Sequence, residues 1–247
     1  MEDAPSQARE YNIHVLRKKS VKLTLKTDPA DTVITLKDAD SKKLKAENGV
    51  YTLKAEETYS YVAVKAGYVT KKDTISVTED TEKTITMEKA PESTRKDVSA
   101  AWKNFRNSDD NMGITSAKTP TSEATTYEKW FKKLGSGWGA APSVQIIVDN
   151  SLIVMSANHI YKLDLNTGDI LQTGDMVAAT NFGYTPPTYA DGMIFAPLAD
   201  GRVQAFNAET LESLWVYQDT LKGQSLSPIT YSDGYIYTGF WNAETKD

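Results

Sequence analysis

The chain has 247 residues, a formal net charge of −5, 40 % hydrophobic residues and 25 % charged residues. This length predicts two domains, because a single small β-sandwich needs fewer residues. The acidic balance argues against a nucleic-acid surface, and no apolar run approaches the roughly 18 residues that would span a bilayer. The sequence contains no cysteine, which excludes disulfides, thiolate metal sites and cysteine nucleophiles.

The first residues do not look like a targeting signal. Residues 1–7 are polar and acidic, so we expect any secretory signal to lie outside this sequence. Residues 11–17 alternate apolar and polar side chains like a strand. The pattern Tyr-x-apolar-x-Val-x-Arg resembles the closing strand of cadherin-like sandwich repeats on bacterial surface proteins. We therefore assign residues 1–18 either to the end of an upstream domain or to an edge strand.

Residues 19–89 predict a small β-sandwich of the Ig-like kind. Short alternating segments are separated by turn formers such as Asp28-Pro29 and Asn48-Gly49, a spacing typical of sandwiches. The expected strands are residues 21–25, 32–36, 49–53, 60–64, 74–77 and 83–87. The Thr27-Asp-Pro-Ala30 turn, the Gly-Val-Tyr-Thr-Leu strand at 49–53 and the Tyr-Val-Ala-Val-Lys-Ala-Gly-Tyr run at 61–68 resemble PEGA-like and carboxypeptidase-regulatory-like domains. In that family such modules are structural or contact carbohydrate.

Two groups in this sandwich allow a functional and a structural interpretation. Asp38, Asp40 and Glu47 could supply oxygen ligands to calcium, or the two aspartates could cap a hairpin turn, which is their commoner role. Four tyrosines could form a sugar-stacking platform, or pack in the core and at its edge, which explains them more simply. They are Tyr51, Tyr59, Tyr61 and Tyr68.

Residues 90–100 predict a linker, because they carry Pro91 and mixed charges without an apolar period. From residue 101 the sequence repeats. A turn followed by a strand recurs every 42 residues, and a second turn, Leu163–Gly168 against Phe206–Leu211, recurs after 43. The first turns are Asp149-Asn150, Asp191-Gly192 and Asp233-Gly234, pairs that suit the positive φ angles of tight hairpins.

A period near 42 built only from strands suits a four-stranded propeller blade. The Asp-Gly hairpin, the Leu-Asp-Leu-Asn-Thr-Gly turn and the closing tryptophan resemble the repeat of PQQ-like β-propellers over about residues 101–247. Trp102–Gly113 is similar to the opening of the first blade in that family, and Glu128–Trp130 to a closing strand. We expect Trp130 and Trp215 to act as structural wedges between blades.

The pattern departs from the repeat at two positions. Gln172 stands where the second unit should have its closing tryptophan, and Leu211 replaces the turn glycine. These changes predict a less regular second blade. The fold class is therefore all-β: a small Ig-like sandwich plus an incomplete PQQ-like propeller of about three blades. Propellers close with roughly four to eight blades, so we expect the chain to be cut from a longer polypeptide.

No catalytic constellation is expected. His14 and His159 fall in different predicted domains, and no Ser/His/Asp arrangement suggests a triad. The Asp164–Asp169 run lacks the later glutamate of a calcium loop. Gly135–Gly139 lacks the Lys-Ser/Thr and the helix of a phosphate loop. We therefore predict no enzyme, no cofactor and no metal.

The best candidates for ligand contact are aromatic residues beside Gly and Pro in loops. They are Trp138, Phe182, Tyr184 and Trp241. The combined resemblance implies a binding or scaffold module on the surface of a bacterial cell, with a glycan or a protein as ligand. Its other partners would be the remaining domains of the parent polypeptide, without membrane insertion in this segment. The alternatives are part of a quinoprotein-like enzyme with its active site elsewhere, and an outer-membrane assembly scaffold, against which the missing lipobox cysteine argues.

Overall fold

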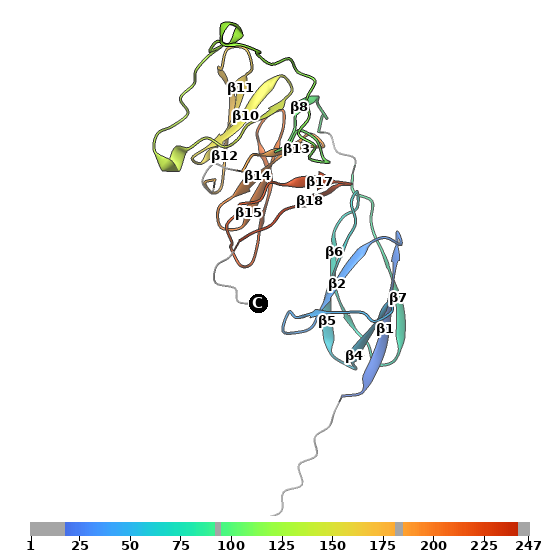
Figure 1. Cartoon of the computed structure of the whole chain (residues 1–247). Coiled ribbons are helices and arrows are strands. Elements are labelled where there is room, and N and C mark those ends of the chain that lie inside the picture. The colour runs from blue at the N-terminus through green and yellow to red at the C-terminus, as the bar shows by residue number, and fades with distance from the viewer. Residues whose placement is uncertain (1–17, 92–94, 181–184, 242–247) are drawn as a thin grey trace, which may run out of the picture. The chain divides into compact units, whose positions relative to one another are not determined.

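The computed structural model describes residues 18–91, 95–180 and 185–241 of the chain. It divides into two compact units, Met1–Pro91 and Glu92–Asp247 (Figure 1), and each is described by itself. The strand assigned to residues 11–17 lies outside the described residues. Strands and turns make up nearly all regular structure, which confirms the all-β prediction.

The N-terminal unit is a sandwich of two sheets with strand orders β4-β1-β7 and β3-β2-β5-β6. Every predicted strand forms, with ends shifted by no more than three residues, and β3 is an additional short strand. In β1, the buried Val21 and Leu23 alternate with exposed residues, so one face of the strand covers the core. The strands are β1 (Ser20–Asp28), β2 (Val33–Lys37), β3 (Lys43–Leu44), β4 (Val50–Lys54), β5 (Thr58–Val64), β6 (Lys71–Ser76) and β7 (Thr81–Thr86).

The ambiguous groups of the sandwich have structural roles. Tyr59 and Tyr61 are 4 % and 2 % exposed within the core cluster, and Tyr51 and Tyr68 pack against its margin. The Asp38 carboxylate accepts hydrogen bonds from the backbone N–H groups of Asp40 (3.1 Å) and Lys42 (2.9 Å), which closes the turn locally. The described tyrosines therefore do not form an exposed sugar platform.

The C-terminal unit contains three sheets packed side by side (Figure 1). Their orders are β12-β11-β10-β9-β8, β13-β14-β15-β16 and β17-β18, all with antiparallel neighbours. The strands are β8 (Ala100–Trp102), β9 (Ile146–Val148), β10 (Ser151–Ser156), β11 (His159–Asp164), β12 (Ile170–Asp175), β13 (Thr188–Ala190), β14 (Met193–Leu198), β15 (Arg202–Asn207), β16 (Ser213–Gln218), β17 (Thr230–Ser232) and β18 (Tyr235–Tyr237).

Apolar cores join these three sheets in series. Ile146, Ile160 and Phe206, all fully buried, belong to one cluster that extends from the first sheet to the second. A second cluster joins Phe195 and Val203 to Ile229, which precedes β17. Removing such side chains from water is the main favourable term in folding, so each sheet depends on its neighbour for its buried face.

The repeated turn residues build three equivalent hairpins. Two-residue loops join β9 to β10, β13 to β14 and β17 to β18. Both residues of each loop have positive φ, the requirement of the tight type I′ turn. The six residues are Asp149, Asn150, Asp191, Gly192, Asp233 and Gly234, with φ between 48° and 77°.

The expected irregularity of the second unit is not found. The sheet of β10–β12 has the same strand lengths as that of β14–β16. Each has one register shift, between Lys162 and Leu163 in one and Ala205 and Phe206 in the other, at equivalent positions. The prediction was wrong because the backbone pairing does not depend on which side chain closes the unit.

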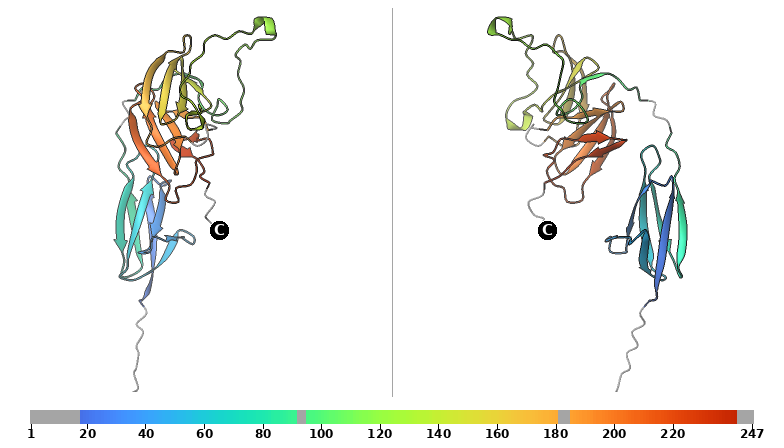
Figure 2. Two further views of the ribbon diagram at one scale, coloured as in Figure 1. Left: turned by 90° about the vertical axis from the view of Figure 1, so that its left-hand side faces the viewer. Right: turned by 45° about the vertical axis from the view of Figure 1, so that its right-hand side comes forward.

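The 43 residues between β8 and β9 contain only two short 3₁₀ turns, η1 (Glu123–Thr125) and η2 (Trp138–Ala140). Figure 2 shows this green segment leaving the sheets as a long loop before it returns to β9. Residues 128–130 therefore do not form the closing strand that we expected. Within the described parts of the chain, no strand pairs with residues 128–130. No helix among the described residues is long and apolar enough to cross a membrane.

Candidate binding site

Trp130 packs on the turn that joins β11 to β12, although it belongs to no strand. Its indole Nε1–H donates to the carbonyl of Leu165 at 3.1 Å. A Cβ added to Gly168, where φ is +74°, would lie 2.5 Å from the indole ring. The turn thus needs glycine for two reasons, the left-handed backbone and the close approach of a tryptophan face. Trp130 therefore packs on a turn of the first sheet, and its expected role as a wedge between two blades stays a prediction.

The same turn recurs after β15 with different side chains. Asp164 Oδ1 accepts from the N–H groups of Asn166 and Thr167, and Asn207 Oδ1 accepts from those of Glu209 and Thr210. The two backbone N–H groups hold the pKa of Asp164 below its ordinary value. The repeat is therefore defined by side-chain-to-backbone bonds that Asp and Asn can both make.

Leu211 replaces the turn glycine and fills the space in front of β12. It has φ +56° and is only 2 % exposed. A Cβ on Gly174 of β12 would lie 2.7 Å from the Leu211 carbonyl and 3.2 Å from its Cβ. Trp130 thus packs on a turn glycine, whereas the equivalent turn carries Leu211, which packs against Gly174 of β12.

The contact between Leu211 and Gly174 predicts coupled substitutions. Leu211→Gly should destabilise the unit by about 2–4 kcal/mol, because it removes a buried side chain. Gly174→Ala alone should also be unfavourable, since its new methyl group would lie 3.2 Å from the Leu211 Cβ and 2.7 Å from the Leu211 carbonyl oxygen. We expect the double variant to be at least about 1 kcal/mol more stable than the sum of the single effects. Urea unfolding of all four proteins measures this coupling, and strict additivity would contradict the contact.

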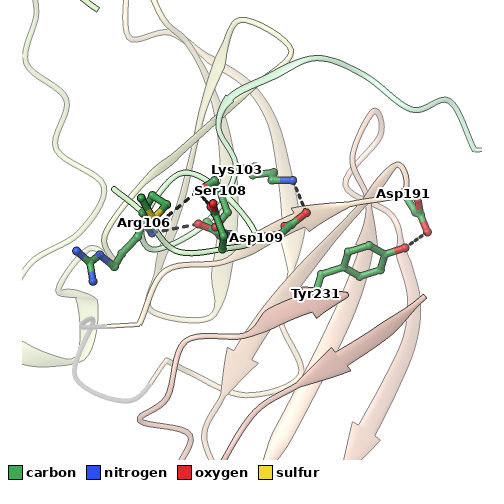
Figure 3. Close-up of polar contacts among 9 residues, drawn as sticks. Lys103, Arg106, Ser108, Asp109, Asp191 and Tyr231 are labelled. Atoms are coloured by element: carbon green, nitrogen blue, oxygen red, sulfur yellow. Dashed lines mark hydrogen bonds and ion pairs between the residues drawn. The ribbon is translucent and has the colours of Figure 1, made fainter. Parts of the chain in front are cut away.

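A cavity of about 350 Å³ opens where the loop after β8 meets the β13–β14 turn. Figure 3 shows two of its polar contacts, the Lys103 amine with Asp109 and the Tyr231 hydroxyl with Asp191. Lys103 Nζ lies 2.6 Å from Asp109 Oδ2, and the Tyr231 hydroxyl donates to Asp191 Oδ2. The loop is held by the buried Asn104, whose side chain donates to the Ser108 carbonyl. These contacts fix the wall of the cavity.

A second tyrosine lines the cavity at the position equivalent to Tyr231. The Tyr189 hydroxyl donates to Asp97 Oδ1 and accepts from the N–H of Val98 at 2.7 Å. Residues 97–98 therefore belong to the C-terminal unit, and the predicted linker at 90–100 does not extend freely to β8. Sequence reasoning missed both tyrosines, although Tyr-x-Asp-Gly at 189–192 and at 231–234 marks them.

Burial and a neighbouring carboxylate stabilise the neutral form of both phenols. Burial is the larger cause for Tyr189, followed by the hydrogen bond to Asp97, and together they raise its pKa to about 12. Burial and the bond to Asp191 likewise raise the pKa of Tyr231 to about 12. Both groups hold their protons at neutral pH, which suits a fixed hydrogen-bond donor and does not suit a general base.

The cavity can therefore bind polar groups, but its residues lack the pairing of a nucleophile with a base. Lys103 is engaged by Asp109, and the described residues contain no group of three His, Asp or Glu side chains placed to hold a metal ion. His159 lies on β11 with its Nδ1 3.0 Å from Asp175. This pair gives the histidine a carboxylate neighbour without a hydroxyl or thiol to activate.

The repeat geometry agrees with the comparison of the sequence with protein families. Residues 121–240 match the PQQ-like repeat family whose description is outer membrane protein assembly factor BamB. The match covers just under half of the chain and supports a PQQ-like β-propeller fold for these residues. The three sheets are accordingly its blades, two of them complete and the β17–β18 blade with two strands. No curated protein matches the chain.

Three solved structures are similar to the chain. A europium-containing methanol dehydrogenase is 21 % identical, with a TM-score of 0.36, over 46 % of this chain and 23 % of its own. A quinohemoprotein alcohol dehydrogenase from Pseudomonas putida HK5 is 20 % identical, with a TM-score of 0.37, over 41 % and 17 %. BamB from Moraxella catarrhalis is 15 % identical, with a TM-score of 0.38, over 91 % and 58 %. The chain thus spans less than two thirds of the length of each.

The aromatic residues predicted to contact a ligand do not form one site. Trp138 is 86 % exposed in η2, next to Ala140, whose carbonyl accepts from Ser156 of the first blade. Trp241 is 55 % exposed and pairs through its backbone with Gln224, beyond the second blade. Phe182 and Tyr184 lie outside the described residues.

Trp215 differs from Trp130 in its surroundings. It lies on β16, the outer strand of the second complete blade, with its ring centroid 5.8 Å from that of Phe195 in the same sheet. It remains 39 % exposed, whereas Trp130 is covered by the turn at Gly168. The described residues place no such turn against Trp215. Its expected role as a wedge between blades stays a prediction.

Proposed function

We propose that this chain is a non-catalytic binding and scaffold module that acts outside the cytoplasm and holds a protein partner on its propeller. The distribution of exposed apolar side chains carries this proposal. Of the large hydrophobic residues exposed among the described residues, all but Val33 and Val69 belong to the propeller unit. Clustered exposed apolar surface is typical of protein contact sites, whereas isolated apolar residues are ordinary.

The sandwich supports this role as a spacer. Its tyrosines are used in the core, and its exposed faces are rich in lysine, such as Lys71 and Lys72 on β6. We propose that it is a PEGA-like structural module that carries the propeller. A glycan ligand on the sandwich is less favoured, because Tyr59 and Tyr61 are buried and Tyr51 and Tyr68 are partly covered at the margin of the core.

Two narrower functions remain as alternatives. The match of residues 121–240 to the BamB family favours an outer-membrane assembly scaffold as the specific form of the module. A quinoprotein-like enzyme is disfavoured, because the cavity residues do not fit a quinone held with calcium. The acidic residues of the cavity are hydrogen-bonded to Lys103, Tyr189 and Tyr231. The described residues also contain no cluster of three His, Asp or Glu side chains that could hold a metal ion.

Photocross-linking tests the module. A photoreactive phenylalanine analogue replaces Trp138 in one variant and Trp241 in another, and Val33 of the sandwich, 59 % exposed, serves as the matched control. After incubation with a cell-envelope extract of the source organism, we expect discrete protein adducts from at least one propeller position and none from position 33. Adducts at no position, or equal adducts at all three, would reject the proposal. Reduction of an added quinone coupled to alcohol oxidation would favour the enzyme instead.

A further inference from the structure

The cavity beside the loop after β8 collects carboxylates from three separate segments of the propeller unit. Asp97 precedes β8, Asp109 belongs to the loop after β8, and Asp191 begins the β13–β14 turn. All three line the same space of about 350 Å³, and Figure 3 shows Asp109 and Asp191 with their partners. This volume is at the lower end of the range for small-molecule sites, so the cavity can hold a compact ligand.

Two tyrosines form part of the cavity wall. Tyr189 is only 4 % exposed, and Tyr231 is half-buried. Each phenol donates its single proton to a carboxylate, Tyr189 to Asp97 and Tyr231 to Asp191. Because an ionised carboxylate can accept about four hydrogen bonds, both carboxylates keep acceptor capacity after the tyrosine bond is made. The tyrosines therefore fix the positions of two acceptors that can still bind a ligand.

Negative charge dominates the residues that line the cavity. Its described lining contains three carboxylates and one cationic side chain, Lys103, which Asp109 already binds at 2.6 Å. The charge of Asp109 also acts on Tyr231, because it contributes, after burial and Asp191, to the raised pKa of that phenol. The lining thus attracts a positively charged group and repels an anion.

Two further cationic residues approach the β13–β14 turn without lining the cavity. Arg95 Nε donates to the main-chain carbonyl of Asp191 at 3.5 Å, and the main-chain carbonyl of Lys96 lies beside Gly192. Neither residue belongs to the described lining of the cavity. The side chains that do line it offer more hydrogen-bond acceptors than donors, which suits a ligand that is rich in N–H groups.

Among cations, a guanidinium group fits this lining best. It is planar, carries several N–H donors and stacks on aromatic rings, whereas an ammonium group is a compact point charge. Because the three carboxylates come from separate segments, a broad and forked donor can bond to more than one of them. A metal ion is not favoured, because the described residues contain no group of three acidic or histidine side chains placed to hold one.

We propose that this cavity binds a guanidinium group, carried either by a small organic cation or by an arginine side chain of a partner protein. The carboxylates of Asp97 and Asp191 accept its N–H groups, and the two tyrosines supply aromatic surface. This inference goes beyond the proposed function, because a cation site of this kind does not require a protein partner.

An NMR titration of the full chain, with isotope-labelled tyrosine rings, tests the proposal. The probe is arginine blocked as N-acetyl-arginine methylamide, and the control is the same derivative of citrulline, whose uncharged urea has nearly the same shape. A Tyr231→Phe variant identifies the Tyr231 signal. We expect the arginine derivative to shift this signal and to bind at least tenfold more tightly than the citrulline derivative, because only its hydrogen bonds are charge-assisted at both ends. Equal binding of the two derivatives, or no binding of the arginine derivative, would overturn the proposal.

A matched pair of variants locates the site. Asp191 and Asp233 begin equivalent hairpins with φ of 51° and 48°, which asparagine also accepts, but of the two only Asp191 lines the cavity. Asp191→Asn should weaken binding of the arginine derivative at least fivefold, and Asp233→Asn should leave it unchanged. Circular dichroism checks that both variants fold. Equal effects of the two changes would count against the cavity, because the probe would then respond only to the overall charge of the chain.

Competition with photocross-linking assigns the source of the guanidinium group. If excess arginine derivative abolishes the adducts at Trp138 or Trp241, an arginine of the partner protein occupies the cavity. If the adducts persist while the derivative binds, the occupant is a small organic cation. Arginine binding without any adduct would leave the cation site standing and reject the proposed protein-binding function. Adducts without arginine binding would reject the cation site alone.

Discussion

Replacing Gly168 by alanine should destabilise the propeller unit by about 1–3 kcal/mol more than the same change at Gly137. Both glycines have nearly the same positive φ, +74° and +75°, so alanine meets the same backbone strain of about 1 kcal/mol at each. At Gly168 the new methyl also lies 2.5 Å from the Trp130 ring, whereas nothing lies within 4 Å at Gly137. Thermal unfolding followed by tryptophan fluorescence measures the difference, at roughly 2–4 °C per kcal/mol for a unit of this size.

The pairing with Trp130 can be tested by a double-mutant cycle. In a Trp130→Ala background the Gly168→Ala change should cost no more than Gly137→Ala, because the ring that the methyl would strike is absent. If Gly168→Ala and Gly137→Ala have equal effects in the original protein, the indole does not press on the turn as described. Trp130 would then be an exposed aromatic residue without a wedge function.

Raising the pH from 10 to 12 should remove about 2 kcal/mol of stability through Tyr189 alone. Its pKa is raised from 10.0 to about 12 in the folded protein, chiefly by burial and then by Asp97. Below pH 10 the phenol is neutral in both the folded and the unfolded chain, so its contribution is fully present. Between pH 10 and 12 the unfolded chain releases the proton while the folded chain retains it, which favours unfolding.

Tyr189→Phe is the matched control for this titration. The variant should be less stable than the original protein at pH 8 by about 1–3 kcal/mol, because Asp97 loses a donor and the Val98 N–H loses an acceptor. Since phenylalanine does not titrate, the two stability curves should converge above about pH 11. Urea unfolding at several pH values measures both curves. Parallel curves would show that the pKa of Tyr189 is not raised in the folded protein.

The local repeat was the most predictable feature of this protein. Asp149-Asn150, Asp191-Gly192 and Asp233-Gly234 identified three hairpins because only a few residue types accept two consecutive positive φ angles. The sandwich strands were equally visible, since a strand with one buried face must alternate. Trp130 was a harder case: it was expected at the end of a closing strand, but no strand forms at residues 128–130 and its ring packs on the turn at Gly168.

The cavity was not predictable from the sequence at the level of its contacts. Asp97 lies 92 residues from Tyr189, and Asp191 lies 40 residues from Tyr231, so no local pattern links each phenol to its carboxylate. The aromatic residues chosen from loop composition, Trp138 and Trp241, are exposed as expected but belong to different parts of the propeller. The composition of a loop predicts that its aromatic residues are exposed. It does not predict which loops lie next to one another in the folded protein.

The sequence by itself determined the fold class, the 42-residue unit and the positions of its turns, because backbone conformation and side-chain alternation are local properties. Tertiary structure alone decided which residues meet across blades. Only packing shows that Leu211 lies against Gly174 of the neighbouring sheet, since the two residues are far apart along the chain. Only the order of strands shows that β16 is an edge, because the same apolar sequence would be an ordinary core strand with a neighbour on each side.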